Sequence, residues 1–416
     1  MKTISPINKS NICLAILSII LLSCNLYSQD QNYLKVKKAL DDVRSEYEKN
    51  ISRKIPSLNV LIQTPADYIF VSSVPAGNEP ITKDTYFRFA SNTKNFTSTS
   101  ILKMQQDGWL DIKSKITDVI PGSITPYIPD TPEFDIPYKN EITIEQLLQH
   151  SAGVYDVDND SVPGYNGLSY VDYMMYKDPA HQYELSELVN QDAVHKLYFF
   201  PPGKGYHYSN TGFTMLSEII ERVYSFKSGA KKYYADYVRD HITGSTAPVP
   251  LDITFPYLAS DVKLPVPYAT GLMLSKDTNV IFTDVNMSAH VGEGNGIATM
   301  SELNKYIRTL MKGENALNKQ NIELMQHSVS DSNKTYGLGC FYIKDLGYGH
   351  NGCIKGYLSL MLYDPETDVS VIVMLPENDY TIPNDEESII KGLKAIVNAG
   401  FAARIALGFS GKLIDY

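Results

Sequence analysis

The chain has 416 residues and a formal net charge of −10 at neutral pH, with 47 acidic and 37 basic side chains. Such an acidic surface argues against nucleic acid as a partner. Beyond the N-terminal segment, only Cys340 and Cys353 remain of the four cysteines, which are too few for a disulfide scaffold. One bridge between them and two free thiols both fit the sequence, and we favour free thiols. The sequence also lacks a CxxC motif or a His/Cys cluster, so we expect no metal.

The first residues have the layout of a secretory signal. Two lysines accompany an apolar run, Ile12–Leu22, that is shorter than the about 20 residues of a membrane-spanning helix. Two cleavage interpretations remain open. Leu21–Cys24 resembles a bacterial lipobox, in which Cys24 would be lipidated and anchor the protein, whereas Leu26–Ser28 suits an ordinary signal peptidase. We favour the lipobox and a signal peptide over residues 1–23. Both interpretations predict a bacterial protein outside the cytoplasm: periplasmic, membrane-anchored or secreted.

The mature chain has roughly 390 residues, enough for one large domain or two closely joined ones. Apolar residues spaced three and four apart between Tyr33 and Tyr47 predict an amphipathic helix. Ser57–Gln63 and Tyr68–Val74 predict the two strands of a hairpin. Residues 93–107 lack Gly and Pro and predict a helix that ends near Gly108.

Residues 116–285 differ in character from the rest of the chain. They are rich in Pro, Asp, Asn and Tyr, with short helical patterns at Ile144–His150 and Thr211–Tyr224. We interpret them as a mostly helical subdomain. It would be inserted into a sheet domain formed by residues 30–115 and 286–416.

The C-terminal part returns to strands. Tyr336–Ile343, Tyr357–Tyr363 and Val369–Leu375 are strand-like, with a turn between the last two. A closing helix is expected, whose apolar face comprises Ile389, Ile390, Leu393, Ile396 and Val397. Strands at both ends of the chain predict an α+β fold, in which one antiparallel sheet flanked by helices is built from both termini.

The strongest chemical feature is Ser91 with Lys94 three residues later, at the predicted start of a helix. Residues i and i+3 share a helix face, so the ammonium can lie beside the hydroxyl. A serine needs such a neighbour to take its proton, and a helix N-terminus favours developing negative charge. Alone the pattern is weak, because a helix cap followed by a surface lysine has the same spacing.

In its context, segment 85–120 resembles the serine β-lactamase and penicillin-binding-protein superfamily. The similar branch holds class C β-lactamases, D-alanyl-D-alanine carboxypeptidases, D-aminopeptidases and related esterases. Three further segments match in the family's order: residues 142–153 resemble its LLxHxSG element, residues 208–210 its Y-x-N motif, and residues 350–352 its H-x-G motif. The resemblance spans roughly residues 55–375 and implies a β-lactamase/transpeptidase-like fold.

The resemblance also implies roles for these residues. Ser91 would attack a carbonyl and form an acyl-enzyme, with the phenol of Tyr208 close by. The proton would go either to Tyr208, as a phenolate stabilised by Lys94 and His350, or to Lys94, with a pKa lowered by burial. The sequence leaves this choice open, because such a set titrates as a coupled system. Asn210 would bond the lysine and the amide of the substrate.

The H-x-G strand would line the site, which makes Asn351 and Gly352 substrate-binding candidates. The backbone N–H groups of Ser91 and Cys353 would form an oxyanion hole, which is usually a large catalytic contribution. Many relatives carry a glycine where Cys353 stands. A side chain at this position could narrow the site or favour particular acyl groups.

We therefore expect a serine hydrolase that acts on a short peptide with D-residues, an amide or an ester, without a cofactor or metal. His350 stands where β-lactamases and many penicillin-binding proteins carry lysine. This favours a D-Ala-D-Ala carboxypeptidase-like or D-aminopeptidase-like peptidase. An esterase is the alternative, followed by a catalytically silent protein that binds cell-wall peptides and by a β-lactamase. His150 matches a family position but is interpreted as structural.

Overall fold

The computed structural model of the protein describes residues 9–274, 279–380 and 385–416, with side chains from residue 30 onward except that of Asp385. The predicted signal peptide and the lipidation candidate Cys24 lie outside the residues whose side chains are described. Among the described helices, none combines the length and apolar character needed to cross a membrane.

The main sheet joins the two ends of the chain. Its strand order is β2-β1-β10-β9-β8-β7, and every neighbouring pair is antiparallel. The strands are β1 (Leu58–Gln63), β2 (Tyr68–Ser73), β7 (Phe341–Ile343), β8 (Gly347–Ile354), β9 (Tyr357–Asp364) and β10 (Val369–Leu375). The N-terminal hairpin thus pairs with the last strand of the C-terminal meander, which confirms the predicted α+β class.

Two small sheets accompany the main one. β3 (Phe87–Arg88) pairs with β6 (Ile297–Ala298), and β11 (Glu377–Asp379), β4 (Leu272–Leu274) and β5 (Asn279–Ile281) form the other. The helices are α1 (Lys9–Asn50), α2 (Thr93–Gln106), α3 (Ile144–Leu148), α4 (Tyr170–Lys177), α5 (Leu185–His195), α6 (Asn210–Ser228), α7 (Tyr234–Val238), α8 (Met300–Met311), α9 (Lys319–His327) and α10 (Asp385–Ala406). Short helical turns are η1 (Ala90–Asn92), η2 (Pro132–Phe134), η3 (Arg239–Thr243) and η4 (Ser288–His290).

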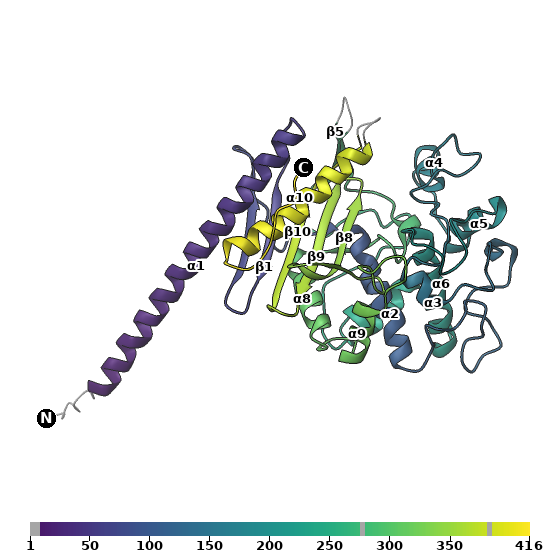
Figure 1. Cartoon of the computed structure of the whole chain (residues 1–416), viewed down its shortest axis with the longest axis horizontal. Helices are drawn as coiled ribbons and strands as arrows, with labels where there is room; N and C mark the ends of the chain where they lie inside the picture. Colours follow the sequence, from purple (N-terminus) through teal and green to yellow (C-terminus); the bar gives the residue numbers. More distant parts are fainter. Residues whose placement is uncertain (1–8, 275–278, 381–384) are drawn as a thin grey trace.

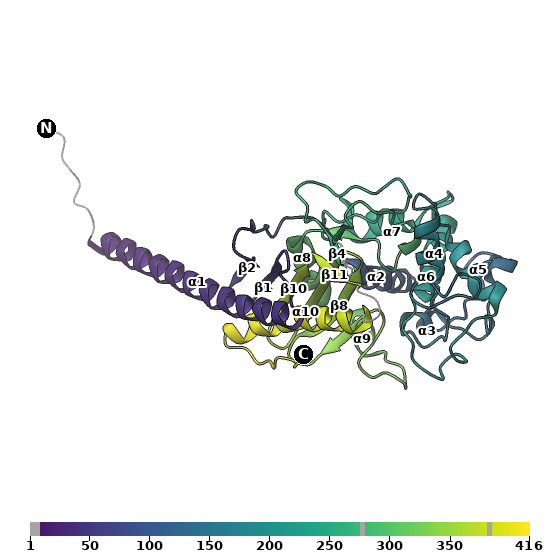
Figure 2. The same cartoon turned by 90° about the horizontal axis from the view of Figure 1, so that it is seen from above.

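Helices cover both faces of the main sheet (Figures 1 and 2). α1 and α10 pack against each other and against one face, while α8 contacts β1, β9 and β10 from the other. The predicted apolar stripe of α1 is buried from Val36 to Tyr47. In α10 the buried side includes Ile396, but Ile390 is 44 % exposed. The prediction of a single buried face is therefore wrong for Ile390.

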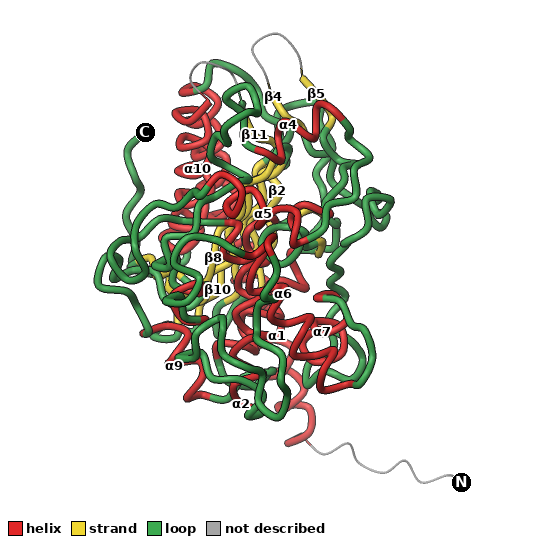
Figure 3. The backbone as a smooth tube through the Cα atoms, turned by 90° about the vertical axis from the view of Figure 1, so that its right-hand side faces the viewer, coloured by secondary structure: helices red, strands yellow, loops and turns green. Residues whose placement is uncertain are grey.

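The middle of the chain forms the helical layer that lies in front of the strands in Figure 3. α2 packs against α6 and so joins this layer to the sheet. Besides the expected helices, it contains α4, α5 and α7, and it also contributes β4 and β5, which the sequence did not indicate. The division into a sheet domain and an inserted subdomain stays a prediction.

The strand predicted from Tyr336 to Ile343 is shorter than expected. Only Phe341–Ile343 forms β7, because the chain turns at Gly337, whose N–H donates to the carbonyl of Cys340 at 2.7 Å. This turn sends the buried side chain of Tyr336 between two histidines. Because β7 begins only at Phe341, it pairs with Gly347–Gly349 alone. On the side of β8 away from β9, no described strand therefore pairs with it beyond Gly349.

Candidate active site

Ser91 lies in the turn η1 between β3 and α2, with its side chain partly exposed. The turn is tight, because Ala90 has a φ of +50°, in the left-handed region that non-glycine residues rarely adopt. Thr93 Oγ1 donates to the Ala90 carbonyl at 2.7 Å, and Asn92 Nδ2 donates to Ser359 Oγ on β9 at 2.8 Å. Such strain persists where the surroundings hold it, which is common at functional sites.

Lys94 lies three residues after Ser91, at the start of α2, and is fully buried. Its Nζ is 3.3 Å from Ser91 Oγ, 2.6 Å from Asn210 Oδ1, and 2.9 and 3.2 Å from the carbonyl and carboxylate oxygens of Glu293. Burial lowers the pKa of Lys94, and the charge of Glu293 opposes this effect. The predicted pairing of Ser91 with Lys94 is thus present, with Asn210 on the same nitrogen.

Tyr208 and Asn210 come together at the start of α6. Ser209 between them caps the helix, since its Oγ accepts from the N–H of Gly212 at 3.1 Å. Tyr208 shares a hydrogen bond with Ser91, and Lys94 Nζ lies 4.7 Å from the centre of its ring. Burial nevertheless raises the pKa of Tyr208 well above its usual value, so the resting side chain is a neutral phenol.

β8 forms the wall opposite α6. A Cβ at Gly352 would lie 2.1 Å from the Phe89 carbonyl oxygen, so only glycine lets the strand approach the turn that carries Ser91. Asn351 and Cys353 line the cleft, whereas Gly352 packs against the turn. Cys353 and Cys340 are free thiols, and Asn378 Nδ2 lies 3.1 Å from the sulfur of Cys353. This confirms the expectation of unbridged cysteines.

His350 is buried behind Tyr208 and does not line the cleft. Its Nδ1 lies 2.5 Å from the Asn351 carbonyl and its Nε2 2.9 Å from the Tyr336 hydroxyl, which is 3.1 Å from His150 Nε2. His150 Nδ1 accepts from the Ser209 N–H at 3.1 Å. The two backbone groups fix both tautomers: His150 Nε2–H donates to Tyr336, and Tyr336 O–H donates to His350 Nε2.

This chain of hydrogen bonds corrects one sequence-based expectation. A protonated His350 would present an N–H to Tyr336 and deprive the tyrosine proton of its acceptor. Burial and the charge of Lys94 lower the pKa of His350 to about 3. His350 is therefore neutral and cannot supply a second positive charge for a Tyr208 phenolate. The structure gives His150 the structural place expected for it, with a left-handed φ of 55° at the turn after α3.

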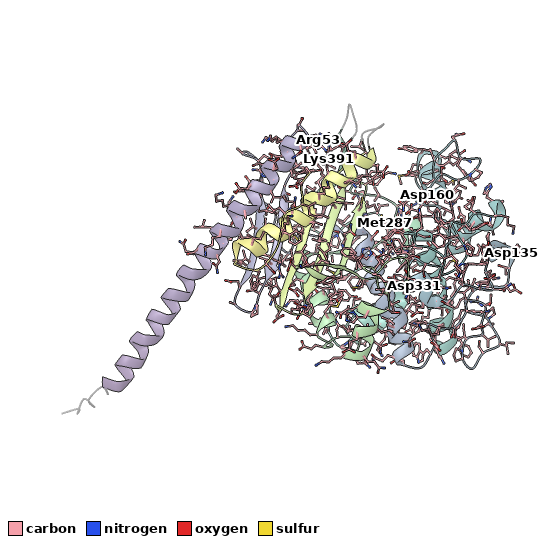
Figure 4. The ribbon with its side chains drawn as sticks, viewed as in Figure 1. Arg53, Asp135, Asp160, Met287, Asp331 and Lys391 are labelled. Atoms are coloured by element: carbon pink, nitrogen blue, oxygen red, sulfur yellow. The ribbon has the colours of Figure 1, made fainter. Side chains whose placement is uncertain are left out.

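Ser91 opens into a cleft of about 520 Å³ between β8 and the helical layer. This volume lies within the range of small-molecule sites, about 300–1,000 Å³. Its apolar lining includes Met175 and Met287, the latter labelled in Figure 4. At one side Lys355, next to β8, forms an ion pair with Asp172 of α4. Lys355 is therefore neither a solvated surface lysine nor an unpaired charge.

Three charged residues of the cleft were missed from the sequence: Asp158, His290 and Glu293. His290 Nδ1 lies 2.6 Å from Glu293 Oε1 and 3.4 Å from Asp158 Oδ2, and the two carboxylates raise the pKa of His290 to about 10. Potential metal-binding atoms of the three lie within 4.8 Å of one another. Because a proton occupies the nitrogen that faces both carboxylates, we assign no metal to them. They belong to no motif, so no sequence signal could have found them.

Comparisons with known proteins agree with this geometry. The sequence model of the family described as Beta-lactamase matches residues 38–387. Penicillin-binding protein 4* of Bacillus subtilis is 28 % identical over 163 residues, which are 39 % of this chain and 29 % of that protein. Protein flp of Staphylococcus aureus (strain MRSA252) is 24 % identical over 72 % of this chain and 54 % of its own. The chain thus spans at most about half the length of these curated relatives.

A solved structure of similar fold is the D-amino acid amidase from Ochrobactrum anthropi SV3 complexed with D-phenylalanine. It has a TM-score of 0.66 and 21 % identity, and the match covers 88 % of this chain and 98 % of that one. At this identity the likeness shows a common fold. The family match, in contrast, spans most of the chain and includes the serine, tyrosine and H-x-G motifs. The chain therefore belongs to the beta-lactamase family of serine hydrolases.

Proposed function

We propose that the protein hydrolyses short peptides or amides that contain a D-residue, through an acyl-enzyme at Ser91. The observation that carries the proposal is the convergence of Lys94 Nζ and the Tyr208 hydroxyl on Ser91 at the cleft. The names of the structural neighbours, a D-amino acid amidase and a D-stereospecific amidohydrolase, support the choice of D-residues. The neutral His350 in place of a lysine supports peptide or amide over β-lactam as the substrate.

The proposed reaction begins when Ser91 Oγ attacks the carbonyl carbon. Its proton passes to the coupled pair of Lys94 and Tyr208, which then protonates the departing amine. The backbone N–H groups of Ser91 and Cys353 receive the oxyanion. Asn210 accepts a hydrogen bond from Lys94 through Oδ1, so its Nδ2 faces away from the lysine and towards Asp158. Water then hydrolyses the ester, with the same pair moving the proton.

The exposed edge of β8 suits an extended substrate. Since β7 begins at Phe341, which pairs with Gly349, the backbone of β8 from His350 onward has no strand partner on the side away from β9 within the described sheet. A peptide backbone can pair with such an edge, while pockets beside the strand select its side chains. Asn351 and Cys353, which line the cleft, are the proposed contacts for the substrate.

The proposed location is outside the cytoplasm, on the basis of the N-terminal segment. Lipidation at Cys24 would anchor the protein to a membrane, and cleavage after Ser28 would release it. Mass spectrometry of the protein purified from its host would separate the two outcomes, because a diacylglyceryl cysteine at the new N-terminus adds a characteristic mass. An unprocessed N-terminus would contradict export.

The test of the catalytic proposal is covalent labelling. The protein is incubated with a fluorophosphonate, a penicillin, p-nitrophenyl esters and D- and L-amino-acid anilides. We expect phosphonylation at Ser91, and turnover of the D-anilides in preference to the L-anilides and esters. Ser91→Ala should abolish phosphonylation and anilide turnover without changing the melting temperature. Ser98→Ala, at a buried serine of α2, is the matched control.

Each result has a definite meaning. An unlabelled wild-type protein would contradict the enzyme assignment and favour a silent peptide-binding protein. Preference for the esters would support the esterase alternative, and rapid release of hydrolysed penicillin would support a β-lactamase.

A further inference from the structure

The loop that follows η4 is held rigidly against α2. Thr97 Oγ1 donates to the Gly292 carbonyl at 2.5 Å, and Thr93 Oγ1 accepts from the N–H of Gly296 at 3.1 Å. Gly292 has a φ of +73°, and a Cβ there would lie 1.8 Å from Ser217 Oγ of α6. Residue 293 is therefore fixed between the two helices that carry Lys94 and Asn210.

Glu293 uses this position to bind Lys94 twice. Its carbonyl oxygen lies 2.9 Å and its Oε2 3.2 Å from Nζ. The second carboxylate oxygen, Oε1, binds His290 Nδ1 at 2.6 Å, and that nitrogen also faces Asp158. Asp158 in turn accepts from Asn210 Nδ2 at 2.6 Å, while Asn210 Oδ1 accepts from Lys94 at 2.6 Å. The five side chains thus form a closed ring.

The ring also fixes the orientation of Asn210. An amide can be flipped when its two ends have similar partners, but here Oδ1 must face an ammonium and Nδ2 a carboxylate. Charge-assisted hydrogen bonds of this kind are stronger than neutral ones. The side chains of Lys94 and Glu293 are 0 % and 3 % exposed, so little water screens their interaction.

Other ionisable groups also face Lys94. The carboxylates of Asp156 and Asp158 raise its pKa, as Glu293 does, and the neutral side chains around it are Tyr208, His150 and His350. Of the carboxylates, only that of Glu293 touches Nζ. His290, as an imidazolium, shares the Glu293 carboxylate with Lys94 and also faces Asp158.

We propose that Glu293 is a positioning residue for the proton transfer at Ser91: held by His290, which also faces Asp158, its carboxylate sets the protonation equilibrium of Lys94. The inference rests on the proposed function, since it assigns Lys94 a part in the proton transfer. It adds that this part is adjusted from residue 293, which reaches Lys94 Nζ from the loop after η4 and lines the same cleft as Ser91. Loss of the carboxylate lowers the pKa of Lys94, and loss of the His290 charge raises it.

The test measures the rate of Ser91 phosphonylation by a fluorophosphonate as a function of pH. In this reaction an Oγ–P bond forms, fluoride leaves, and the serine proton passes to the Lys94–Tyr208 pair. Glu293→Gln keeps the shape of the side chain but removes its charge. In this variant, the limb of the pH–rate profile that reports Lys94 should shift to lower pH by about 1–3 units. In His290→Gln the same limb should shift to higher pH. Glu221→Gln, which changes a partly buried carboxylate of α6 away from Lys94, is the control and should leave the profile unchanged.

The outcomes separate this inference from the proposed function. If wild type is not phosphonylated, the proposed function fails. If wild type reacts but the Glu293→Gln profile coincides with it, or if both variants move in one direction, the role of Glu293 is refuted. Melting curves accompany each profile. Should Glu293→Gln not fold, His290→Gln decides, and an unmoved or lowered limb in that variant overturns the proposal.

Discussion

The hydroxyl of Tyr336 lies between His150 and His350, and its removal is the sharpest test of how this part of the site is built. Tyr336→Phe leaves His150 Nε2–H without an acceptor and His350 Nε2 without a donor, because the opposite nitrogens are engaged by backbone groups. Each buried unsatisfied group costs about 1–3 kcal/mol. We therefore expect the free energy of unfolding to fall by about 2–6 kcal/mol.

The assay is urea unfolding of wild type, Tyr336→Phe and a control, Tyr342→Phe, whose ring is 39 % exposed. The control should stay within about 0.5 kcal/mol of wild type. Nitrogen-15 NMR of the imidazoles should also find the Nε2–H tautomer at His150 and the Nδ1–H tautomer at His350. Equal stability of the Tyr336 variant, or the opposite tautomers, would refute the proposed chain of hydrogen bonds.

Two further changes probe the wall of the cleft and a partly buried carboxylate. Gly352→Ala pushes a methyl group against the Phe89 carbonyl at 2.1 Å. We therefore expect a loss of about 1–3 kcal/mol in unfolding free energy and labelling of Ser91 that is at least about tenfold slower. The control is Gly212→Ala, where the nearest contact of the added methyl group is 3.7 Å and which should be tolerated. Burial raises the pKa of Glu221 to about 7, so its contribution to stability is present below its unfolded pKa and is lost as the pH rises through 7. Between pH 4.5 and 8, the unfolding free energy of Glu221→Gln should therefore rise by up to about 3 kcal/mol relative to that of wild type. A difference between the two proteins that is the same at both pH values would contradict this.

Much of the framework follows from local sequence. The spacing of Ser91 and Lys94 predicts that the two side chains lie close together, and they do, with Ser91 in the turn η1 and Lys94 at the start of α2. α2 itself forms where a run without Gly or Pro predicts it. β9 and β10 are found within one residue of their predicted ends, since apolar strands buried on both faces are continuous in sequence. The motifs also indicated that Tyr208 and Asn210 belong with Ser91.

The tertiary structure decided what these residues meet and how they are charged. Lys94 and Asn210 are 116 residues apart in sequence, and Lys94 and Glu293 are 199 apart, so their contacts depend on how α2, α6 and the loop after η4 pack. His350 was expected to be a source of positive charge, but burial makes it neutral. A spacing of three residues defines geometry within one helix, whereas a pKa depends on every neighbour and on excluded water. For this reason the sequence alone could identify Ser91 and Lys94, but only the folded chain revealed Glu293 as the partner of Lys94.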